Sequence, residues 1–180
     1  FDWSKLYTER REEYLSIIDT TLANGGFILQ SDVVEFERGI AELSGVPHAV
    51  GTSDGTNAIL LGLRALDLPI GSGVAIASHS FIAAAQSIVA AGLVPVPVDL
   101  DENDWLMCPH AARRVLETSD NNISCLMAVH VNGRLCNMPE LLALGEEFGI
   151  LVVEDAAQAL GARIGDTCAG AFGQWGTFSF

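Results

Sequence analysis

The sequence carries little positive charge, and Lys5 is its only lysine. Nine Lys and Arg residues stand against 23 Asp and Glu residues, which gives a net charge of −14 at pH 7. A chain with this charge repels the phosphates of DNA and RNA, and no basic cluster offsets the balance. We therefore expect no nucleic-acid partner. Any phosphate group that binds has to be held locally, by backbone amides and hydroxyl groups.

Long apolar runs and paired cysteines are also missing. No stretch approaches the roughly 18 uninterrupted apolar residues that a membrane-spanning helix needs, and the polar first residues carry no signal-peptide pattern. The sequence has no C-x-x-C pair, so it indicates neither a zinc site nor a disulfide framework. We expect no metal, no membrane contact, a cytoplasmic location and reduced thiols. The four cysteines are Cys108, Cys125, Cys136 and Cys168.

Two common nucleotide-binding motifs are absent. The Gly-Lys-Ser/Thr ending of a Walker loop does not occur. The one G-x-G, Gly71–Gly73, precedes a strand-like run instead of opening a helix. Both observations argue against a P-loop or a dinucleotide-binding fingerprint.

The sequence does contain a regular alternation of two kinds of segment. Continuous apolar strand-like runs with helix-like runs between them predict a mostly parallel sheet covered on both faces. The strand-like runs are 48–52, 74–78, 93–98, 123–131 and 150–154, and a further one covers 173–180. The helix-like runs are 3–22, 31–44, 56–66, 81–91, 109–117 and 138–148.

This alternation predicts an α/β protein with a three-layer α/β/α sandwich. We expect residues 1–30 to form an N-terminal helix and linker, and residues 31–180 to form one large domain. The chain begins without methionine and stops inside a strand-like run. We therefore expect the domain to be incomplete at its C-terminal end.

Ligands of such sheets bind beyond the carboxyl ends of the strands, and the turn Ser53–Thr56 follows the first strand-like run. An apolar helix begins there, and its free N–H groups suit a phosphate, with Gly55 allowing close approach and Thr56 adding a hydroxyl. The alternative is that Ser53 or Asp54 simply caps the helix. The charge of Asp54 opposes a bound anion unless its side chain points away.

Two other residues follow strand-like runs at the same edge. Phe81 comes after the second run, where its ring could lie on a planar ligand or pack into the core. Ser179 lies near the end of the chain, and its hydroxyl is a candidate second phosphate donor. His130, after the fourth run, is more typical of a structural loop residue than of a base.

The stretch GILVVEDAAQALGA places two carboxylates, Glu154 and Asp155, at the end of a strand buried on both faces. A carboxylate there is costly unless it meets a positive partner. The protonated pyridine nitrogen of pyridoxal 5'-phosphate is one such partner, and Gln158 could then reach the ring hydroxyl or pack on the ring face. The alternative is that Asp155 caps a helix over the following AAQAL segment.

Taken in order, these segments resemble the DegT-type family of pyridoxal-phosphate-dependent sugar aminotransferases. The resemblance covers essentially the whole chain. FILQSDVVEFERGIAELSGVPHAVGTSDGTNAILLGLRAL is similar to the opening block of the family, and AIASHSFIAAAQSIVAAGLVPVPVDLD is similar to its second block. AVHVNGRLCNMPELLALGEEFGILVVEDAAQALGA and GTFSF form the most diagnostic stretch.

The resemblance implies the N-terminal portion of the large domain of the aspartate-aminotransferase fold, that is, fold-type-I pyridoxal-phosphate enzymes. It further implies a homodimer that transfers an amino group from glutamate to a nucleotide-linked keto sugar. By matching positions, the residues implied to hold the phosphate are Gly55, Thr56 and Ser179. Phe81 would stack on the ring, Asp155 would pair with the ring nitrogen as the catalytic carboxylate, and Gln158 would contact the ring oxygen.

The sequence departs from the family in one important respect. The family's Schiff-base lysine lies a few residues beyond the FSF segment, and Lys5 matches no such position. Two alternatives to an aminotransferase therefore stay open: a pyridoxal-phosphate sugar dehydratase, in which a histidine replaces that lysine, and a non-catalytic fragment. A smaller departure is Asn132, where the family often has an aromatic residue.

Overall fold

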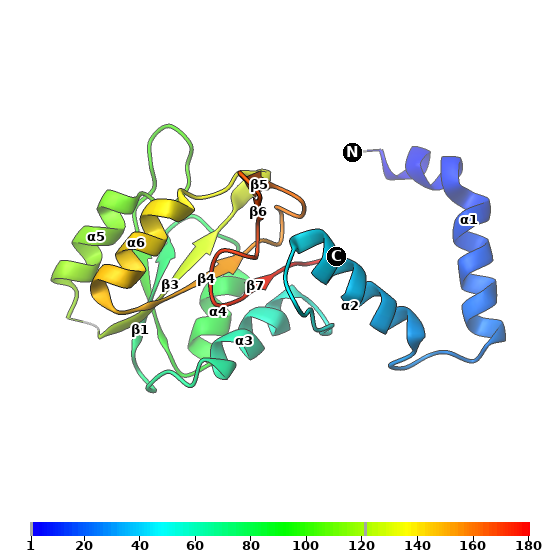
Figure 1. Ribbon diagram of the computed structural model, residues 1–180, viewed down its shortest axis with the longest axis horizontal. Helices are drawn as coiled ribbons and strands as arrows, with labels where there is room; N and C mark the ends of the chain where they lie inside the picture. Colours follow the sequence, from blue (N-terminus) through cyan, green and yellow to red (C-terminus); the bar gives the residue numbers. More distant parts are fainter. Residues whose placement is uncertain (1, 121) are drawn as a thin grey trace.

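The computed structural model describes residues 2–120 and 122–180, and a five-stranded parallel sheet forms its centre (Figure 1). The strand order is β2-β1-β3-β4-β7, and every neighbouring pair is parallel. All five carboxyl ends therefore meet at one edge. The strands are β1 (Gly73–Ala77), β2 (Val94–Val98), β3 (Ile123–Val129), β4 (Leu151–Asp155) and β7 (Gly176–Thr177).

Helices cover both faces of this sheet. One face packs on α3 (Gly55–Ala65) and α4 (Ile82–Ala90), and the other packs on α5 (Pro109–Thr118) and α6 (Met138–Phe148). Figure 1 shows α5 and α6 together on one side and α3 and α4 on the other. The sheet thus separates two apolar clusters, and the predicted three-layer sandwich is confirmed.

Successive side chains of β4 belong alternately to these two apolar clusters. Val152 belongs to the cluster under α5 and α6, and Val153 belongs to the cluster under α3 and α4. Because successive side chains of a strand point to opposite faces, Glu154 faces the α5–α6 side. Asp155 faces the α3–α4 side.

The edge strand β2 has the sequence VPVPV, with its two prolines on the outer side. The Val94 N–H donates inward to the Ser72 carbonyl, and the Ser78 N–H donates to the Val98 carbonyl. Pro95 and Pro97 have no N–H group to offer. Proline at such outward positions costs no ladder bond and protects the edge from further pairing.

The N-terminal helices lie beside the sandwich. α2 covers Ser31–Ser44, whereas α1 (Trp3–Ala23) buries none of its residues and stands apart from the sheet (Figure 1). Among the helices in the described part of the chain, none combines the length and apolar character needed to cross a bilayer.

Two sequence predictions of strands differ from the structure. Residues 48–52 form no strand, because Val50 is 81% exposed and the Gly51 N–H donates to the Glu37 carboxylate and not to a neighbouring strand. The run 173–180 contributes only the two residues of β7. The structure adds the short hairpin of β5 (Arg163–Ile164) and β6 (Thr167–Cys168), and a 3-10 turn, η1 (Val131–Gly133).

Candidate functional site

The order in which successive strands are added to the sheet changes direction at β1. The strand that follows β1 in sequence, β2, pairs on one side, and β3 pairs on the other side. Crevices beyond the carboxyl ends at such a reversal are the usual ligand sites of open α/β sheets. Phe81 follows β1 and His130 follows β3, so both lie at this edge.

The structure brings Gly55 and Ser179 together, although 124 positions separate them in the chain. A Cβ atom built on Gly55 would lie 2.8 Å from the Ser179 Cβ and 3.0 Å from its Oγ. Gly55 is the first residue of α3 and Thr56 is the second. The first turn of α3 and the Ser179 hydroxyl therefore form one small polar cradle, which only glycine at position 55 leaves open.

Asp54 caps α3, as the alternative interpretation predicted. Its Oδ1 accepts from the Asn57 N–H at 2.8 Å, and its Oδ2 accepts from the Asn57 amide and the Ser53 hydroxyl. These hydrogen bonds, that of the Asn57 N–H first, lower the pKa of Asp54. The Asp54 carboxylate therefore occupies the Asn57 N–H group, and it points toward Ser53 and Asn57.

Phe81 is not a core residue. Its side chain is 73% exposed, and it lies immediately before α4. An exposed aromatic ring at the carboxyl edge is available to a planar ligand, so the core interpretation was wrong.

Asp155 ends β4 and is only 5% exposed. Its Oδ1 accepts from the Ala157 N–H at 3.2 Å. Burial raises the pKa of this carboxyl above its ordinary value, and the Ala157 N–H and His130 offset part of the rise. Residues 156–160 form turns and no helix, so the helix-capping interpretation was wrong.

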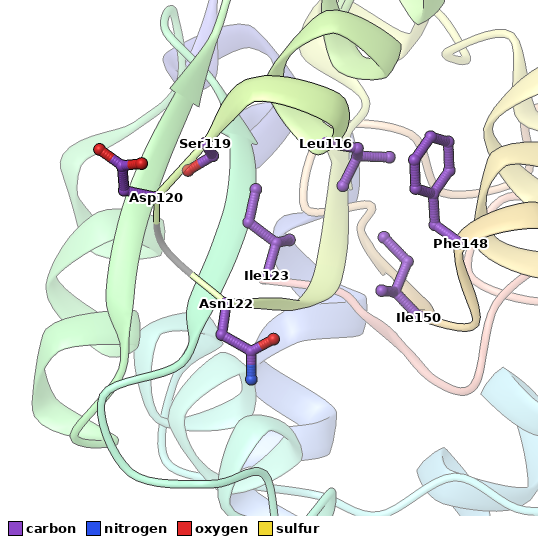
Figure 2. A pocket seen from close by; sticks show the side chains of 7 residues that line it. All are labelled: Leu116, Ser119, Asp120, Asn122, Ile123, Phe148 and Ile150. Carbon is purple, nitrogen blue, oxygen red and sulfur yellow. The ribbon is translucent and has the colours of Figure 1, made fainter.

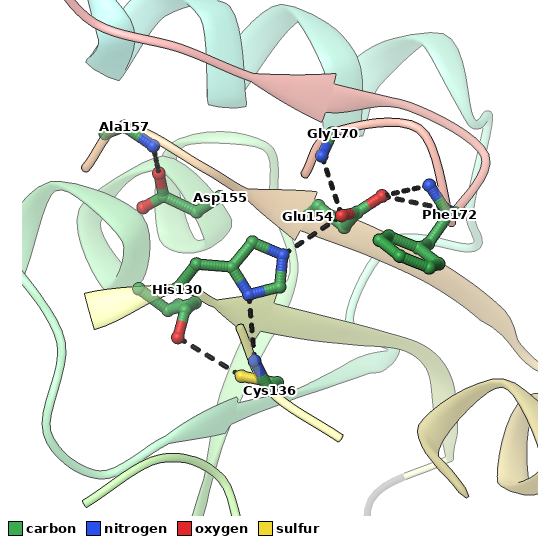
Figure 3. Close-up of polar contacts among 9 residues, drawn as sticks. His130, Cys136, Glu154, Asp155, Ala157, Gly170 and Phe172 are labelled. Carbon is green, nitrogen blue, oxygen red and sulfur yellow. Dashed lines mark hydrogen bonds and ion pairs between the residues drawn. The ribbon is translucent and has the colours of Figure 1, made fainter. Parts of the chain in front are cut away.

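Glu154 has four hydrogen-bond donors around it and is fully buried (Figure 3). Its Oε1 accepts from the N–H groups of Phe172 and Gly173 at 2.7 and 2.8 Å. Its Oε2 accepts from the Gly170 N–H at 2.8 Å and from His130 Nε2 at 3.0 Å. The carboxylate therefore holds the loop 170–173 against the end of β3, on the face opposite Asp155.

His130 is a structural residue, as predicted. Its Nδ1 accepts from the Cys136 N–H at 3.2 Å, so the proton on Nε2 is the one shared with Glu154. The His130 backbone N–H donates to the Asp155 carbonyl at 2.9 Å. The structural role of Glu154 was not predicted from the sequence. The pattern that could have indicated it is a carboxylate at the end of a buried strand, followed later in the chain by a glycine-containing loop.

Gln158 is exposed and contacts the turn after β3. Its Oε1 accepts from the Asn132 N–H at 2.8 Å, and Asn132 has the left-handed backbone angle φ 56°. The contact joins the segments that follow β3 and β4. It leaves the amide nitrogen of Gln158 on the same edge of the sheet as Asp155.

A pocket lies at the edge of the sheet opposite the candidate site (Figure 2). Its volume is about 400 Å³, and it opens between the ends of α5 and α6 and the amino ends of β3 and β4. Ligands of parallel sheets bind at the carboxyl edge, so this pocket is not part of the candidate site. Its lining residues are Leu116, Ser119, Asp120, Asn122, Ile123, Phe148 and Ile150.

Residues 8–180 match the model of the DegT/DnrJ/EryC1/StrS aminotransferase family. The chain belongs to this family. The match includes every residue of the cradle and both carboxylates of β4, so the predicted resemblance is confirmed.

Two relatives and one solved structure illustrate the likeness. A UDP-N-acetyl-3-dehydro-alpha-D-glucosamine 3-aminotransferase of Acidithiobacillus ferrooxidans is 36% identical over 94% of this chain and 45% of its own length. The putative pyridoxal phosphate-dependent aminotransferase EpsN of Bacillus subtilis is 37% identical over 82% of this chain and 39% of its own length. A DegT DnrJ EryC1 StrS aminotransferase structure from Brucella abortus superposes with a TM-score of 0.94, at 27% identity, over 100% of this chain and 49% of that chain.

A dehydratase has a similar fold as well. The structure of an E. coli GDP-4-keto-6-deoxy-D-mannose-3-dehydratase with bound hydrated PLP gives a TM-score of 0.82 at 25% identity, over 91% of this chain and 43% of that chain. The chain spans about half the length of the relatives it matches. The likeness therefore covers the region that carries the cradle and Asp155.

Proposed function

We propose that this chain carries the pyridoxal 5'-phosphate site of an aminotransferase that moves an amino group from glutamate to a nucleotide-linked keto sugar. The observation that carries the proposal is the meeting of Gly55 and Ser179 at the start of α3, on the sheet face to which Asp155 points. The aminotransferase names of the relatives support the same class of reaction.

The cradle suits the phosphate group of this cofactor. Backbone N–H groups at the start of a helix attract an anion, and the helix dipole adds to the attraction. Gly55 and Thr56 supply the helix start, and the hydroxyls of Thr56 and Ser179 are further donors. No basic side chain is needed, in keeping with the strongly negative charge of the chain.

Asp155 and Phe81 suit the ring of the cofactor. The Asp155 carboxylate is buried with one N–H donor, so a ligand cation would relieve its unfavourable burial. Phe81 offers an exposed ring face at the same edge. Gln158, held by Asn132, has its amide nitrogen left to donate to an oxygen on the ring.

When bound, pyridoxal phosphate supplies a protonated pyridine ring that withdraws electrons from the reacting carbon of the substrate. Asp155 keeps the ring nitrogen protonated, because a buried carboxylate favours the charged form of a neighbouring base. The cradle fixes the position of the phosphate, and Phe81 and Gln158 fix the plane of the ring. A fixed ring is what positions a substrate carbon for proton transfer.

We assign the covalent bond to the cofactor to none of these 180 residues. Lys5 is the only lysine, and it lies in α1, which buries no residue and stands apart from the sheet (Figure 1). A sugar dehydratase is the second candidate function, which the likeness to the E. coli dehydratase favours. Both candidates use the same cradle and the same Asp155.

We further propose that the protein is cytoplasmic, and that residues 1–30 form a segment distinct from the domain at 31–180. We also propose that the protein is a homodimer. Large apolar side chains are exposed along α1 and after it, and a partner subunit would cover them. They include Ile17, Ile18, Leu22, Phe27, Ile28 and Leu29.

The test is an activity assay of the full-length protein that carries this chain. With glutamate, pyridoxal phosphate and a nucleotide-linked keto sugar, an aminotransferase forms 2-oxoglutarate and an amino sugar in equal amounts. Loss of water from the sugar without an amino sugar identifies a dehydratase. We expect Asp155→Asn to lower kcat by at least about 100-fold, the lower end of what a general acid or base group contributes. A variant with the full transamination rate would refute the role of Asp155.

A further inference from the structure

Thr177 is a buried residue whose hydroxyl has no hydrogen-bond partner. Its side chain is 7% exposed, and the Oγ1 atom is one of four buried polar side-chain atoms without a partner among the described residues. The other three are Ser44 Oγ, Ser72 Oγ and Trp175 Nε1. Burying an unpaired hydroxyl costs free energy, so each such atom calls for a physical explanation.

Thr177 lies directly beside Asp155 in the sheet. The two residues are register partners on the parallel strands β7 and β4, and the Ala156 N–H donates to the Thr177 carbonyl at 2.9 Å. Neighbouring strands are about 4.8 Å apart, and register partners in a parallel pair present their side chains on the same face. Trp175, two residues before Thr177, packs on Gly62 of α3, which places the Thr177 side chain on the α3–α4 face with Asp155.

The two carboxylates of β4 differ in how many donors they have. Glu154 accepts four hydrogen bonds, whereas the structure gives Asp155 one bond, 3.2 Å long, from Ala157. An ionised carboxylate can accept about four. A threonine exchanges its hydroxyl and methyl positions by moving between staggered rotamers, so the unpaired Thr177 hydroxyl can turn toward the neighbouring strand.

We infer that Thr177 is a positioning residue, whose hydroxyl donates to the Asp155 carboxylate and holds it ionised toward the cofactor ring. The inference rests on the proposed function, because it concerns the same cofactor site. Thr177 is also two residues before Ser179 in the chain. Thr177 is thus the sheet neighbour of the residue assigned to the ring nitrogen, and it is close in sequence to a residue assigned to the phosphate.

The test is a binding titration of the full-length apoprotein with pyridoxamine 5'-phosphate, which forms no covalent bond to a lysine. Thr177→Val removes the hydroxyl and keeps the shape of the side chain. We expect it to weaken binding about tenfold, since hydrogen bonds to charged groups are the stronger class. Thr177→Ser, which keeps the hydroxyl, restores most of the affinity. Ser72→Ala removes an equally buried unpaired hydroxyl next to the amino end of β1, and binding is unchanged.

A double-mutant cycle separates an effect through Asp155 from a general loss of packing. In the Asp155→Asn background we expect Thr177→Val to cause no further loss of affinity. Equal affinity of Thr177→Val and the unaltered protein overturns the inference, and so does the same tenfold loss in both backgrounds. If the unaltered protein fails to bind pyridoxamine phosphate, the proposed function itself is wrong, and the inference falls with it.

Discussion

Glu154 and Asp155 are neighbours in the chain, but the strand turns their carboxylates to opposite faces of the sheet. Glu154 is surrounded by three backbone N–H groups and His130 and holds a loop. Asp155 is nearly as buried with a single donor. The first carboxylate is satisfied within the protein, and the second is left for a ligand.

Asp155 should make the empty protein less stable at neutral pH. Its pKa is raised by burial, so the folded state holds this proton more tightly than the unfolded chain does. The proton on Asp155 therefore stabilises the folded protein fully when the pH is below 3.8, the ordinary pKa of the group. This stabilisation is lost as the pH rises through the raised pKa of the folded state. We therefore predict that Asp155→Asn raises the Tm of the apoprotein near pH 7. The measurement is thermal unfolding without cofactor over a range of pH.

The gain in Tm should shrink as the pH falls toward 3.8, because both proteins then carry an uncharged side chain at this position. Asp101→Asn is a control at an exposed carboxylate whose pKa is lowered instead by hydrogen bonds from Asn103. It should lower or preserve the Tm near pH 7. A Tm that falls in Asp155→Asn near pH 7 would contradict the account.

Glu154 should be intolerant even of glutamine. In either orientation of the amide, two of the four buried donors face an NH2 group and lose their acceptor. Each buried donor left without an acceptor costs about 1–3 kcal/mol. We predict that Glu154→Gln lowers the free energy of unfolding in a denaturant titration by about 2–5 kcal/mol. The same change at exposed Glu102 should have almost no effect, and equal stability of the two variants would be inconsistent with this network.

At the scale of elements, α3 reaches β7 through a contact that requires a glycine. A Cβ atom built on Gly62 would lie 2.7 Å from Cε2 of the Trp175 indole. The helix therefore packs closely on the residue before β7, and this contact keeps the start of α3 next to Ser179. Gly39, in the middle of α2, has no atom within 4 Å of its Cβ position.

These two helical glycines should respond to alanine in opposite directions. Gly39→Ala should stabilise by about 0.5–1 kcal/mol, because alanine is the better helix former and nothing obstructs it. Gly62→Ala should destabilise, since overpacking typically costs about 1–3 kcal/mol and the indole has to move. Chemical denaturation of both variants measures the difference. Stabilisation by Gly62→Ala would show that α3 and β7 are not tightly packed.

Periodicity predicted the main elements within one or two residues at most ends, because long apolar strands and helices with local end signals need no tertiary information. It failed at 48–52, where an apolar run lacks a neighbouring strand among the described residues, and at 173–180, where only Gly176–Thr177 form a strand. The pairing of a strand depends on distant residues, which a local pattern does not contain.

The site could be predicted only in part. The carboxyl-edge rule pointed to Phe81, Asp155 and the start of α3, and the family resemblance gave their roles. The Gly55–Ser179 contact depends on β7 pairing beside β4, and the Glu154 network depends on the loop 170–173 folding back. Both are contacts between segments far apart in sequence, so composition and spacing do not reveal them.

At the scale of the whole molecule, α1 has an exposed apolar surface that the proposed homodimer would cover. Ile18 and Leu22 are more than half exposed and lie one helical turn apart. We predict that the double variant Ile18→Asp/Leu22→Asp shifts the full-length protein from dimer to monomer in analytical ultracentrifugation. Ser16→Asp adds charge on the same helix away from these two side chains and should leave the dimer intact. A dimer that survives the double variant would place the interface elsewhere.

The variant Gly55→Ala tests whether the start of α3 and Ser179 form the phosphate cradle of a pyridoxal-phosphate site. The new methyl group would lie 2.8 Å from the Ser179 Cβ and fill the cradle. The measurement is the affinity of the full-length apoprotein for pyridoxal phosphate by absorbance titration, with Gly39→Ala as the matched control. We predict that Gly55→Ala weakens binding by about tenfold or more, the value of one hydrogen bond to a charged group, while Gly39→Ala binds normally. Equal affinities of the two variants would contradict the account.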